Sequence, residues 1–174
     1  MTEIDVVIAD ITTFPADAIV NAANVSLKGG GGVDGAIHRA AGEALDIACS
    51  LFGGCPTGET RTTIAFNIKT AKFIIHTPGP RFSEARAEEC DALLEACYRN
   101  SLRAAEEHDC KSVAFPSIST GIYRFPLDRA AAIVARVFDE YRTQPGALER
   151  VTMCCFDDAS AQAYRAAFAR RKLI

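Results

Sequence analysis

The sequence lacks the features that mark several large classes of protein. Its 19 lysines and arginines are outnumbered by 22 acids, which gives a net charge of −3, whereas nucleic-acid-binding domains are usually strongly basic. No apolar run approaches the length of a membrane span. The first residues, MTEIDVVIAD, contain acids rather than the basic stretch that opens a secretory signal. We therefore expect a cytoplasmic protein with no membrane partner, and we do not expect nucleic acid as a partner.

Paired cysteine motifs are also missing. The seven cysteines form an odd number without any C-x-x-C pair, and several lie in apolar stretches such as VTMCCF (151–156). Such cysteines are typical of reduced, buried thiols in a cytoplasmic protein. Cys90 and Cys97 fall on one predicted helix, and no pair of histidines has metal-ligand spacing. We predict that the protein needs no metal.

What remains is an ordinary globular composition, with 49% hydrophobic and 24% charged residues among 174. No linker, repeat or heptad pattern interrupts the chain, so residues 1–174 are expected to form a single domain and a monomer. Short apolar runs alternate with helical patterns, which predicts a three-layer α/β/α sandwich around a buried sheet. The predicted strands are 4–9, 17–23, 60–67, 72–77, 112–118 and 150–156, and the predicted helices are 34–52, 83–109, 127–143 and 160–172.

A glycine-rich stretch, NAANVSLKGGGGVDG (21–35), follows the second predicted strand. Gly30, Gly32 and Gly35 match G-x-G-x-x-G, but a dinucleotide fingerprint needs its first glycine directly after a strand. A P-loop needs a Gly-Lys-Ser/Thr that is missing here. A flexible surface loop is the plain alternative. Against it, the stretch enters a helix N-terminus, where free amides attract anions.

A second loop of similar character is FPSISTGIYRFP (115–126), between a predicted strand and a predicted helix. Its hydroxyls and amides suit a phosphate, although a Ser/Thr turn can also satisfy its own backbone. Both loops follow strands, and ligands of open α/β sheets bind at the carboxyl ends of strands. Two amide-rich loops at that edge suit a diphosphate without any lysine or arginine.

At these residues the sequence resembles the macro domain family, and within it the MacroD-type hydrolases. The resemblance lies in ADIT (9–12), DAIVNAAN (17–24), GGGGVDGAIHRAAG (29–42), CPTGE (55–59), HTPGP (76–80) and FPSISTGIY (115–123). It implies a mixed six-stranded sheet and a site for ADP-ribose. It also implies release of ADP-ribose from acidic side chains of mono-ADP-ribosylated proteins and deacetylation of O-acetyl-ADP-ribose. Neither reaction needs a redox cofactor.

The resemblance assigns the adenine end to residues that follow the first and last strands. Asp10 would accept a hydrogen bond from the adenine amino group, Ile11 would border the base, and Phe156 would stack on it. Asp10 has the alternative of capping its own turn, and Phe156 that of an ordinary core residue. The family usually has glycine before this aspartate, whereas this chain has Ala9.

At the other end, the resemblance makes Asn24 a partner of the distal ribose hydroxyls, since an amide is both donor and acceptor. Bare backbone at Gly30, Gly31, Gly32 and Val33 would approach the diphosphate and the sugar. Asp34 is the predicted catalytic residue, supported by Asn24 and by the space beside Gly32. Two alternatives stay open: Asp34 as a helix N-cap, or as a group that only positions water.

The second loop would wrap the phosphates through Ser119, Thr120, Gly121, Ile122 and Tyr123, with Tyr123 covering the distal ribose. Arg124 stands where many relatives have glycine. His38 and His76 are expected to have structural roles, and Asn21 to hold the first loop. The alternative to a hydrolase is a module that binds ADP-ribose without cleaving it.

Overall fold

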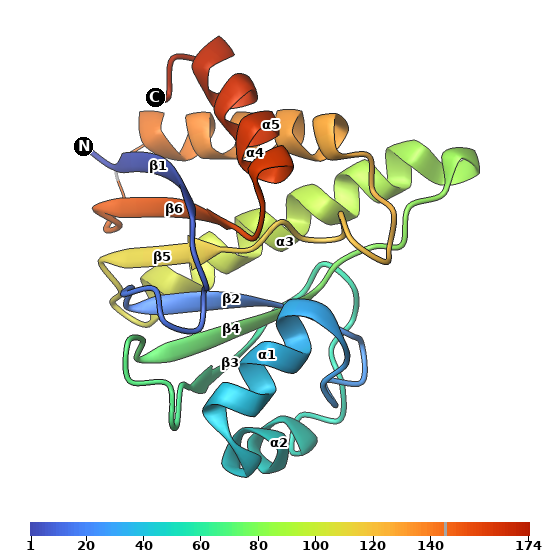
Figure 1. Cartoon of the computed structure of the whole chain (residues 1–174), viewed down its shortest axis with the longest axis vertical. Helices are drawn as coiled ribbons and strands as arrows, with labels where there is room; N and C mark the ends of the chain where they lie inside the picture. The colour runs from blue at the N-terminus through green and yellow to red at the C-terminus, as the bar shows by residue number, and fades with distance from the viewer. Residues whose placement is uncertain (145) are drawn as a thin grey trace.

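A computed structural model describes residues 1–144 and 146–174. Its centre is a six-stranded sheet in the order β1-β6-β5-β2-β4-β3. All neighbouring pairs are parallel except β3 and β4, which run antiparallel at one edge (Figure 1). The mixed sheet confirms the predicted fold class. The strands are β1 (Glu3–Ile8), β2 (Ala18–Ala23), β3 (Arg61–Ile64), β4 (Phe73–Pro78), β5 (Ser112–Phe115) and β6 (Arg150–Cys155).

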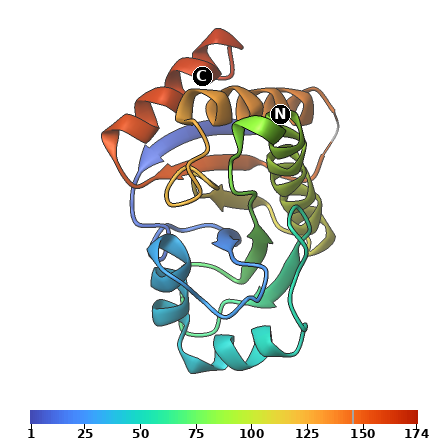
Figure 2. The same cartoon turned by 90° about the vertical axis from the view of Figure 1, so that its right-hand side faces the viewer.

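Helices cover both faces of the sheet (Figures 1 and 2). One core lies beneath α3, α4 and α5 and the other beneath α1 and α2, and strand residues alternate between them: Val113 and Phe115 belong to the first core, Ala114 to the second. This alternation is what a sheet buried on both faces requires. The helices are α1 (Gly32–Ala41), α2 (Glu43–Ser50), α3 (Ala87–Glu107), α4 (Leu127–Thr143) and α5 (Asp158–Arg170), with a 3-10 turn η1 (Glu84–Arg86) before α3.

Two expectations for the region after the glycines were wrong. The single helix predicted over 34–52 is broken at Gly42, whose φ of 92° lies outside the helical region, and two helices result. Asp34 is not the N-cap: α1 already begins at Gly32, its N-cap is Gly31, and no side chain caps it. Asp34 therefore lies within the first helical turn. The strands predicted over 60–67 and 112–118 are also shorter, with β3 and β5 ending at Ile64 and Phe115.

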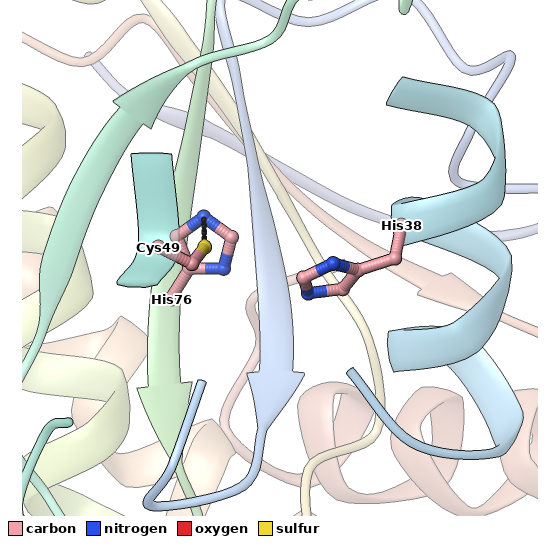
Figure 3. A group of neighbouring side chains, drawn as sticks. All are labelled: His38, Cys49 and His76. Atoms are coloured by element: carbon pink, nitrogen blue, oxygen red, sulfur yellow. Dashed lines mark hydrogen bonds between the residues drawn. The ribbon is translucent and has the colours of Figure 1, made fainter. Parts of the chain in front are cut away.

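All seven cysteines are free and buried, as predicted. Cys49 of α2 lies against His76 of β4, with 3.8 Å between its Sγ and Nε2, and His38 of α1 approaches from the other side (Figure 3). The ligand atoms of these three residues lie within 4.8 Å of one another, a proximity that sequence spacing gave no sign of. Burial raises the pKa of Cys49 to about 11, with Asp34 and Asp46 adding to the effect.

Hydrogen bonds with two neighbouring side chains hold the His76 ring in this trio. Thr63 Oγ1 lies 3.1 Å from His76 Nε2, and the Asn21 amide nitrogen lies 3.1 Å from His76 Nδ1. Burial, reinforced by the nearby His38, lowers the pKa of His76 to about 3, so its ring is neutral. Because the amide donates to Nδ1, the ring's proton lies on Nε2, which donates to Thr63. We interpret the trio as a hydrogen-bonded core cluster.

Within the described part of the chain, no helix is both long and apolar enough to cross a bilayer.

Candidate active site

A cavity of about 890 Å³ follows the carboxyl ends of four neighbouring strands, β1, β6, β5 and β2. Its volume is typical of a site for a small molecule. The loops after these strands line it, together with Gly79 after β4 and the first turns of α1 and α5. The expected crevice at the strand ends is therefore present, and β2 and β5, which lead into the two amide-rich loops, are paired neighbours.

The predicted site residues all line this cavity, although their contacts with a ligand stay predictions. They are Asp10, Ile11, Asn24, Gly30, Gly31, Gly32, Val33, Asp34, Ser119, Thr120, Gly121, Ile122, Tyr123 and Phe156.

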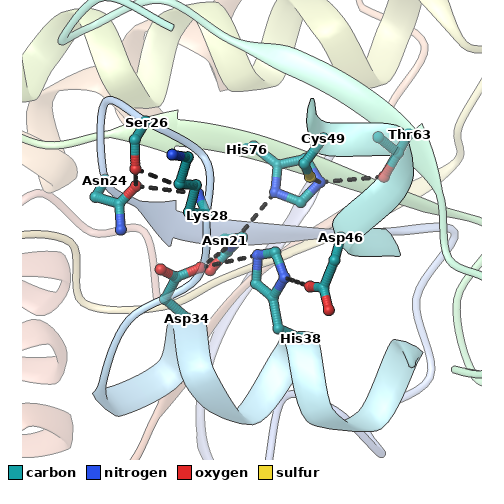
Figure 4. A network of polar contacts seen from close by, with 10 residues as sticks. All are labelled: Asn21, Asn24, Ser26, Lys28, Asp34, His38, Asp46, Cys49, Thr63 and His76. Carbon is teal, nitrogen blue, oxygen red and sulfur yellow. Dashed lines mark hydrogen bonds and ion pairs between the residues drawn. The ribbon is translucent and has the colours of Figure 1, made fainter. Parts of the chain in front are cut away.

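A network of polar side chains holds Asp34 in the first turn of α1 (Figure 4). Its Oδ1 accepts a hydrogen bond of 2.8 Å from the Asn21 amide, and His38 Nε2 lies 3.3 Å from the same oxygen. Asp46 of α2 fixes the His38 ring through a 2.6 Å contact at Nδ1. The structural role of His38 stays a prediction. Asn21, which was expected to hold the loop, contacts Asp34 directly.

The pKa of Asp34 reflects two opposing influences. Burial raises it, because only 5% of the residue is exposed and a carboxylate loses solvation there. Hydrogen bonds from Asn21 and the Gly30 amide, and the charge of His38, work in the other direction. The balance leaves a carboxyl with a pKa above the usual range, a property common among catalytic acids and bases.

Asn24 and Asp34 converge on the backbone of Gly30. A Cβ placed on Gly30 would lie 3.6 Å from Asn24 Nδ2 and 3.5 Å from Asp34 Oδ2. The Oδ1 of Asn24 accepts from Ser26 Oγ (2.6 Å) and from the Lys28 amide (3.3 Å). The amide group was expected to offer both donor and acceptor to a sugar, but its oxygen is already engaged, so only the Nδ2 donor faces the cavity.

The glycines of this segment serve different purposes. A Cβ on Gly31 or Gly32 would meet none of the described residues within 4 Å, so these residues border open space, and Gly32 also has a φ of 59°. A Cβ on Gly35, by contrast, would collide with the carbonyl oxygen of Gly30. No side chain among the described residues caps α1, so the amides of its first turn, which lines the cavity, are left without a capping partner. The open side of the glycine run is the side where a ligand would lie.

Of the adenine-end candidates, Asp10 and Phe156 are exposed, whereas Ile11 is buried. Asp10 lies two residues beyond β1 and caps its own turn, accepting from Thr12 Oγ1 (2.7 Å) and the Thr12 amide (2.9 Å), which lowers its pKa. Both bonds use Oδ1, so the turn-capping alternative coexists with a free Oδ2. Phe156 is 94% exposed at the cavity, which excludes the alternative of a core phenylalanine. An exposed aromatic ring beside a cavity is available to stack on a base.

The second loop surrounds the middle of the cavity. Ser119 is buried, and its Oγ has no protein partner among the described residues. Tyr123 lies at the rim beneath the Arg81 guanidinium, whose carbon is 4.9 Å from the ring centre. Arg124 is exposed and does not line the cavity.

Sequence reasoning missed several lining residues. Gly79 packs so tightly against Ser119 that any Cβ on it would collide with the serine hydroxyl. Arg39 of α1 and the start of α5, Asp157 and Ser160, also line the cavity. Asp157 caps α5 by accepting from the Ser160 amide at 2.8 Å. The Asp-x-x-Ser spacing after a strand was the available signal for this helix start.

The fold and the cavity define an α/β protein with a small-molecule cleft at the ends of its parallel strands. The Macro domain family model matches residues 20–134. A macro domain-containing protein of Chlorobaculum tepidum is 52% identical over 161 residues, 92% of each chain. An O-acetyl-ADP-ribose deacetylase of Klebsiella pneumoniae is 47% identical, over 92% of this chain and 93% of the relative. The Oceanobacillus iheyensis macrodomain with ADP superposes with a TM-score of 0.90 at 37% identity, covering 96% of this chain and 90% of that structure. The chain therefore belongs to the macro domain family.

Proposed function

We propose that this protein binds ADP-ribose and hydrolyses acyl esters of its distal ribose. The substrates would be O-acetyl-ADP-ribose and proteins mono-ADP-ribosylated on acidic side chains. The observation that carries the proposal is the convergence of the buried Asp34 carboxylate and the Asn24 amide beside the bare backbone of Gly30. The name of the Klebsiella pneumoniae relative and the ADP in the Oceanobacillus iheyensis structure support the same reading.

The ligand's orientation follows from the character of the two ends of the cavity. The exposed ring of Phe156 and the free oxygen of Asp10 suit adenine, which needs a stacking surface and an acceptor for its amino group. The amides at the start of α1 and in the Ser119–Tyr123 loop suit the diphosphate. The distal ribose then lies against Asn24 and Asp34.

In the proposed reaction, Asp34 accepts a proton from a water molecule that attacks the acyl carbon. The bond between that carbon and the ribose oxygen breaks, the ribose oxygen takes up the proton held by Asp34, and a carboxylic acid is released. Asn24 Nδ2 donates to a ribose hydroxyl and fixes the ester near the carboxylate. A base whose pKa is raised takes a proton from water more readily than an ordinary carboxylate does. Both substrates carry the same kind of bond, so one site serves both.

The test is release of ADP-ribose from a glutamate-linked mono-ADP-ribosylated protein and of acetate from O-acetyl-ADP-ribose. Wild type is compared with Asp34→Ala and with Asp34→Asn, which keeps the shape and one acceptor for Asn21. We expect both variants to lose turnover by about a hundredfold or more while retaining binding of ADP-ribose in calorimetry. A folded wild type that binds ADP-ribose but releases neither product would make the protein a reader instead. Equal loss of binding and turnover in both variants would give Asp34 a binding role only.

A further inference from the structure

The Ser119–Tyr123 loop has a backbone that needs support. Two of the residues between β5 and α4, Ser119 and Arg124, have φ of 66° and 59°, although neither is glycine. A residue with a Cβ occupies this region at a cost in energy, so the surrounding structure must hold it there. Local turns contribute: the Arg124 amide donates to Gly121 O and the Phe125 amide to Ser119 O, both at 2.9 Å. These turns close the loop on itself but do not attach its first half to the body of the protein.

Tyr98 of α3 attaches the first half of the loop to the protein core. Its hydroxyl donates to the carbonyl oxygen of Pro116 at 3.0 Å and accepts from the amide of Ile118 at 3.1 Å. The side chain is 0% exposed, and its ring packs against those of Phe115 and Phe138. One immobile hydroxyl thus pairs the two backbone groups on either side of Ser117.

Tyr164 of α5 makes a second attachment through the side chains of the loop. Its hydroxyl lies 2.6 Å from Ser117 Oγ, which lies 2.6 Å from Thr120 Oγ1. Thr120 Oγ1 donates to the carbonyl oxygen of Ser117 at 3.1 Å. Each hydroxyl has one hydrogen, so the chain of donors runs from Tyr164 to Ser117 to Thr120 and ends on that carbonyl.

Both phenols keep their protons throughout the neutral range. Burial raises the pKa of Tyr164 to about 12 and raises that of Tyr98 well above its ordinary value. The two hydroxyls come from helices on the same face of the sheet, and neither tyrosine lines the cavity. Tyr98 and Tyr164 can therefore influence the cavity only through the loop that they contact.

We propose that Tyr98 and Tyr164 are positioning residues, which hold the loop after β5 in the conformation that receives the diphosphate. A loop fixed before binding spares the ligand the entropy of ordering it, so removal of either hydroxyl weakens the diphosphate contacts specifically. This inference rests on the binding part of the proposed function and does not require hydrolysis.

The experiment uses Tyr98→Phe and Tyr164→Phe, which remove only the hydroxyls and preserve the packed rings. Tyr141→Phe is the matched control, because the Tyr141 hydroxyl also makes two hydrogen bonds: it donates to Glu106 and accepts from the Leu148 amide at 3.2 Å. Tyr141 lies on α4 away from the cavity. Affinity for ADP is measured by calorimetry and affinity for adenosine, which lacks the diphosphate, by NMR titration. Thermal unfolding is followed for every variant.

We expect each loop variant to bind ADP about five- to tenfold more weakly, the factor that one net hydrogen bond provides, with adenosine affinity unchanged. Tyr141→Phe should lower the unfolding temperature without changing either affinity. Unchanged ADP affinity in both loop variants, or an equal loss for ADP and adenosine, would overturn the proposal and leave the tyrosines a merely structural role. A folded wild type that does not bind ADP would overturn the proposed function itself, and this inference with it.

Discussion

The two loops that line the cavity reach similar open conformations by different means. In the segment that leads into α1, glycine takes two of the three left-handed positions, with φ of 77° at Gly29 and 59° at Gly32, and this conformation costs glycine little. The third is Leu27, with φ of 59°, whose buried side chain packs into the core. In the loop after β5 the same region is occupied by Ser119 and Arg124. At its glycines the first loop therefore adopts left-handed backbone at little cost, whereas both left-handed positions of the second loop carry a Cβ and need support from the surrounding structure.

The difference matches what each loop contributes to the cavity. The glycine segment carries the two side chains expected to act on the ribose, Asn24 and Asp34, and a network of polar side chains orients them. The loop after β5 offers mainly backbone amides and hydroxyls, and its supports are hydrogen bonds to that backbone. Removing glycines should therefore damage the first loop most, and removing anchors the second.

The largest effect is expected for Gly35→Ala. The new Cβ would collide with the carbonyl oxygen of Gly30, a backbone atom that cannot move alone. Gly30 lies beside Asp34, since a Cβ on Gly30 would be 3.5 Å from Asp34 Oδ2, so we expect the collision to displace the carboxylate as well. A misplacement of about 1 Å is enough to lower turnover about a hundredfold, and overpacking of this kind destabilises by about 1–3 kcal/mol. Hydrolysis assays and urea unfolding measure the two effects.

Gly31→Ala is the control within the same glycine run. Its Cβ would meet none of the described residues within 4 Å, and its φ of −88° suits any residue. Stability should stay near that of the wild type while affinity for ADP-ribose falls, because the methyl group enters the space where a ligand would lie. If Gly31→Ala destabilises the protein as much as Gly35→Ala does, glycine is needed there for the backbone and the comparison of the loops is wrong.

The second prediction concerns the dependence of stability on pH, because His76 near the first loop and the phenols beneath the second loop titrate in different pH ranges. The first loop is linked to His76 through Asn21, whose amide contacts both Asp34 and the His76 ring. The pKa of His76 is lowered to about 3 from an ordinary 6.5. Because the folded value is the lower one, the stability from neutral His76 is complete above pH 6.5 and is lost as the pH falls toward 3. The slope from this group reaches about 1.4 kcal/mol per pH unit. The phenols that hold the other loop do not titrate in this window.

His76→Gln isolates this contribution, because Asp34 and its raised pKa are present in both proteins. The raised pKa of Asp34 acts in the opposite sense, adding stability as the pH falls, and it cancels in the comparison. We expect the wild type to lose stability more steeply than the variant between pH 6.5 and 4.5 in urea unfolding. Amide exchange should rise first in the glycine segment and not in the loop after β5. Parallel slopes for the two proteins would mean that His76 is protonated in the fold.

A smaller effect is expected outside both loops, at the exposed ring of Phe156. Aromatic stacking on a base contributes about 1–3 kcal/mol at nucleic-acid sites, so Phe156→Ala should weaken ADP-ribose binding about five- to 150-fold. Turnover at saturation should not change, because the ring lies at the end of the cavity away from Asp34. Leu51→Ala removes an apolar side chain that is 83% exposed and does not line the cavity, and it should leave the affinity for ADP-ribose unchanged. An unaltered affinity in Phe156→Ala would mean that adenine does not stack on this ring.

Sequence alone predicted the sheet, the layers and the meeting of the two loops, because these follow from local patterns and from parallel strand order. Apolar runs identified the strands, and their carboxyl ends necessarily share an edge. The same reasoning misplaced the start of α1 by taking Asp34 for its cap, since an aspartate after glycines is a strong local signal. The actual partner of Asp34, Asn21, lies on β2, and only the tertiary structure brings the two together.

The anchors beneath the second loop were beyond sequence reasoning for a related reason. Tyr98 and Tyr164 fall at apolar positions of amphipathic helices, where a tyrosine is read as core. Both are in fact core residues, fully buried, and only their hydroxyls reach the loop. Gly79 is similar: its close approach to Ser119 joins two loops that are about forty residues apart in the chain. Long-range contacts of single atoms leave no periodic trace in a sequence.

The smallest effect is expected for Arg124→Gly, which places glycine at a left-handed position of the second loop, as the first loop has at Gly29 and Gly32. Arg124 is exposed, and its φ of 59° is costly for any residue with a Cβ. Glycine should stabilise the protein by up to about 1 kcal/mol, which raises the melting temperature by about 2–4 °C for a chain of this size. Arg124→Ala removes the guanidinium but keeps the Cβ, and it should give no such gain.

Affinity for ADP-ribose separates the two explanations of how the second loop keeps its shape. If the tyrosine anchors suffice, Arg124→Gly binds as tightly as the wild type, because Arg124 lies after the residues that they hold. Equal weakening in Arg124→Gly and Arg124→Ala would instead make the guanidinium a ligand contact. Weakening in the glycine variant alone would mean that the restricted backbone of a non-glycine residue is itself part of the support. In that case the two loops would differ in a second way: the first loop functions with flexible glycine at the left-handed positions 29 and 32, whereas the second requires a restricted, non-glycine residue at position 124.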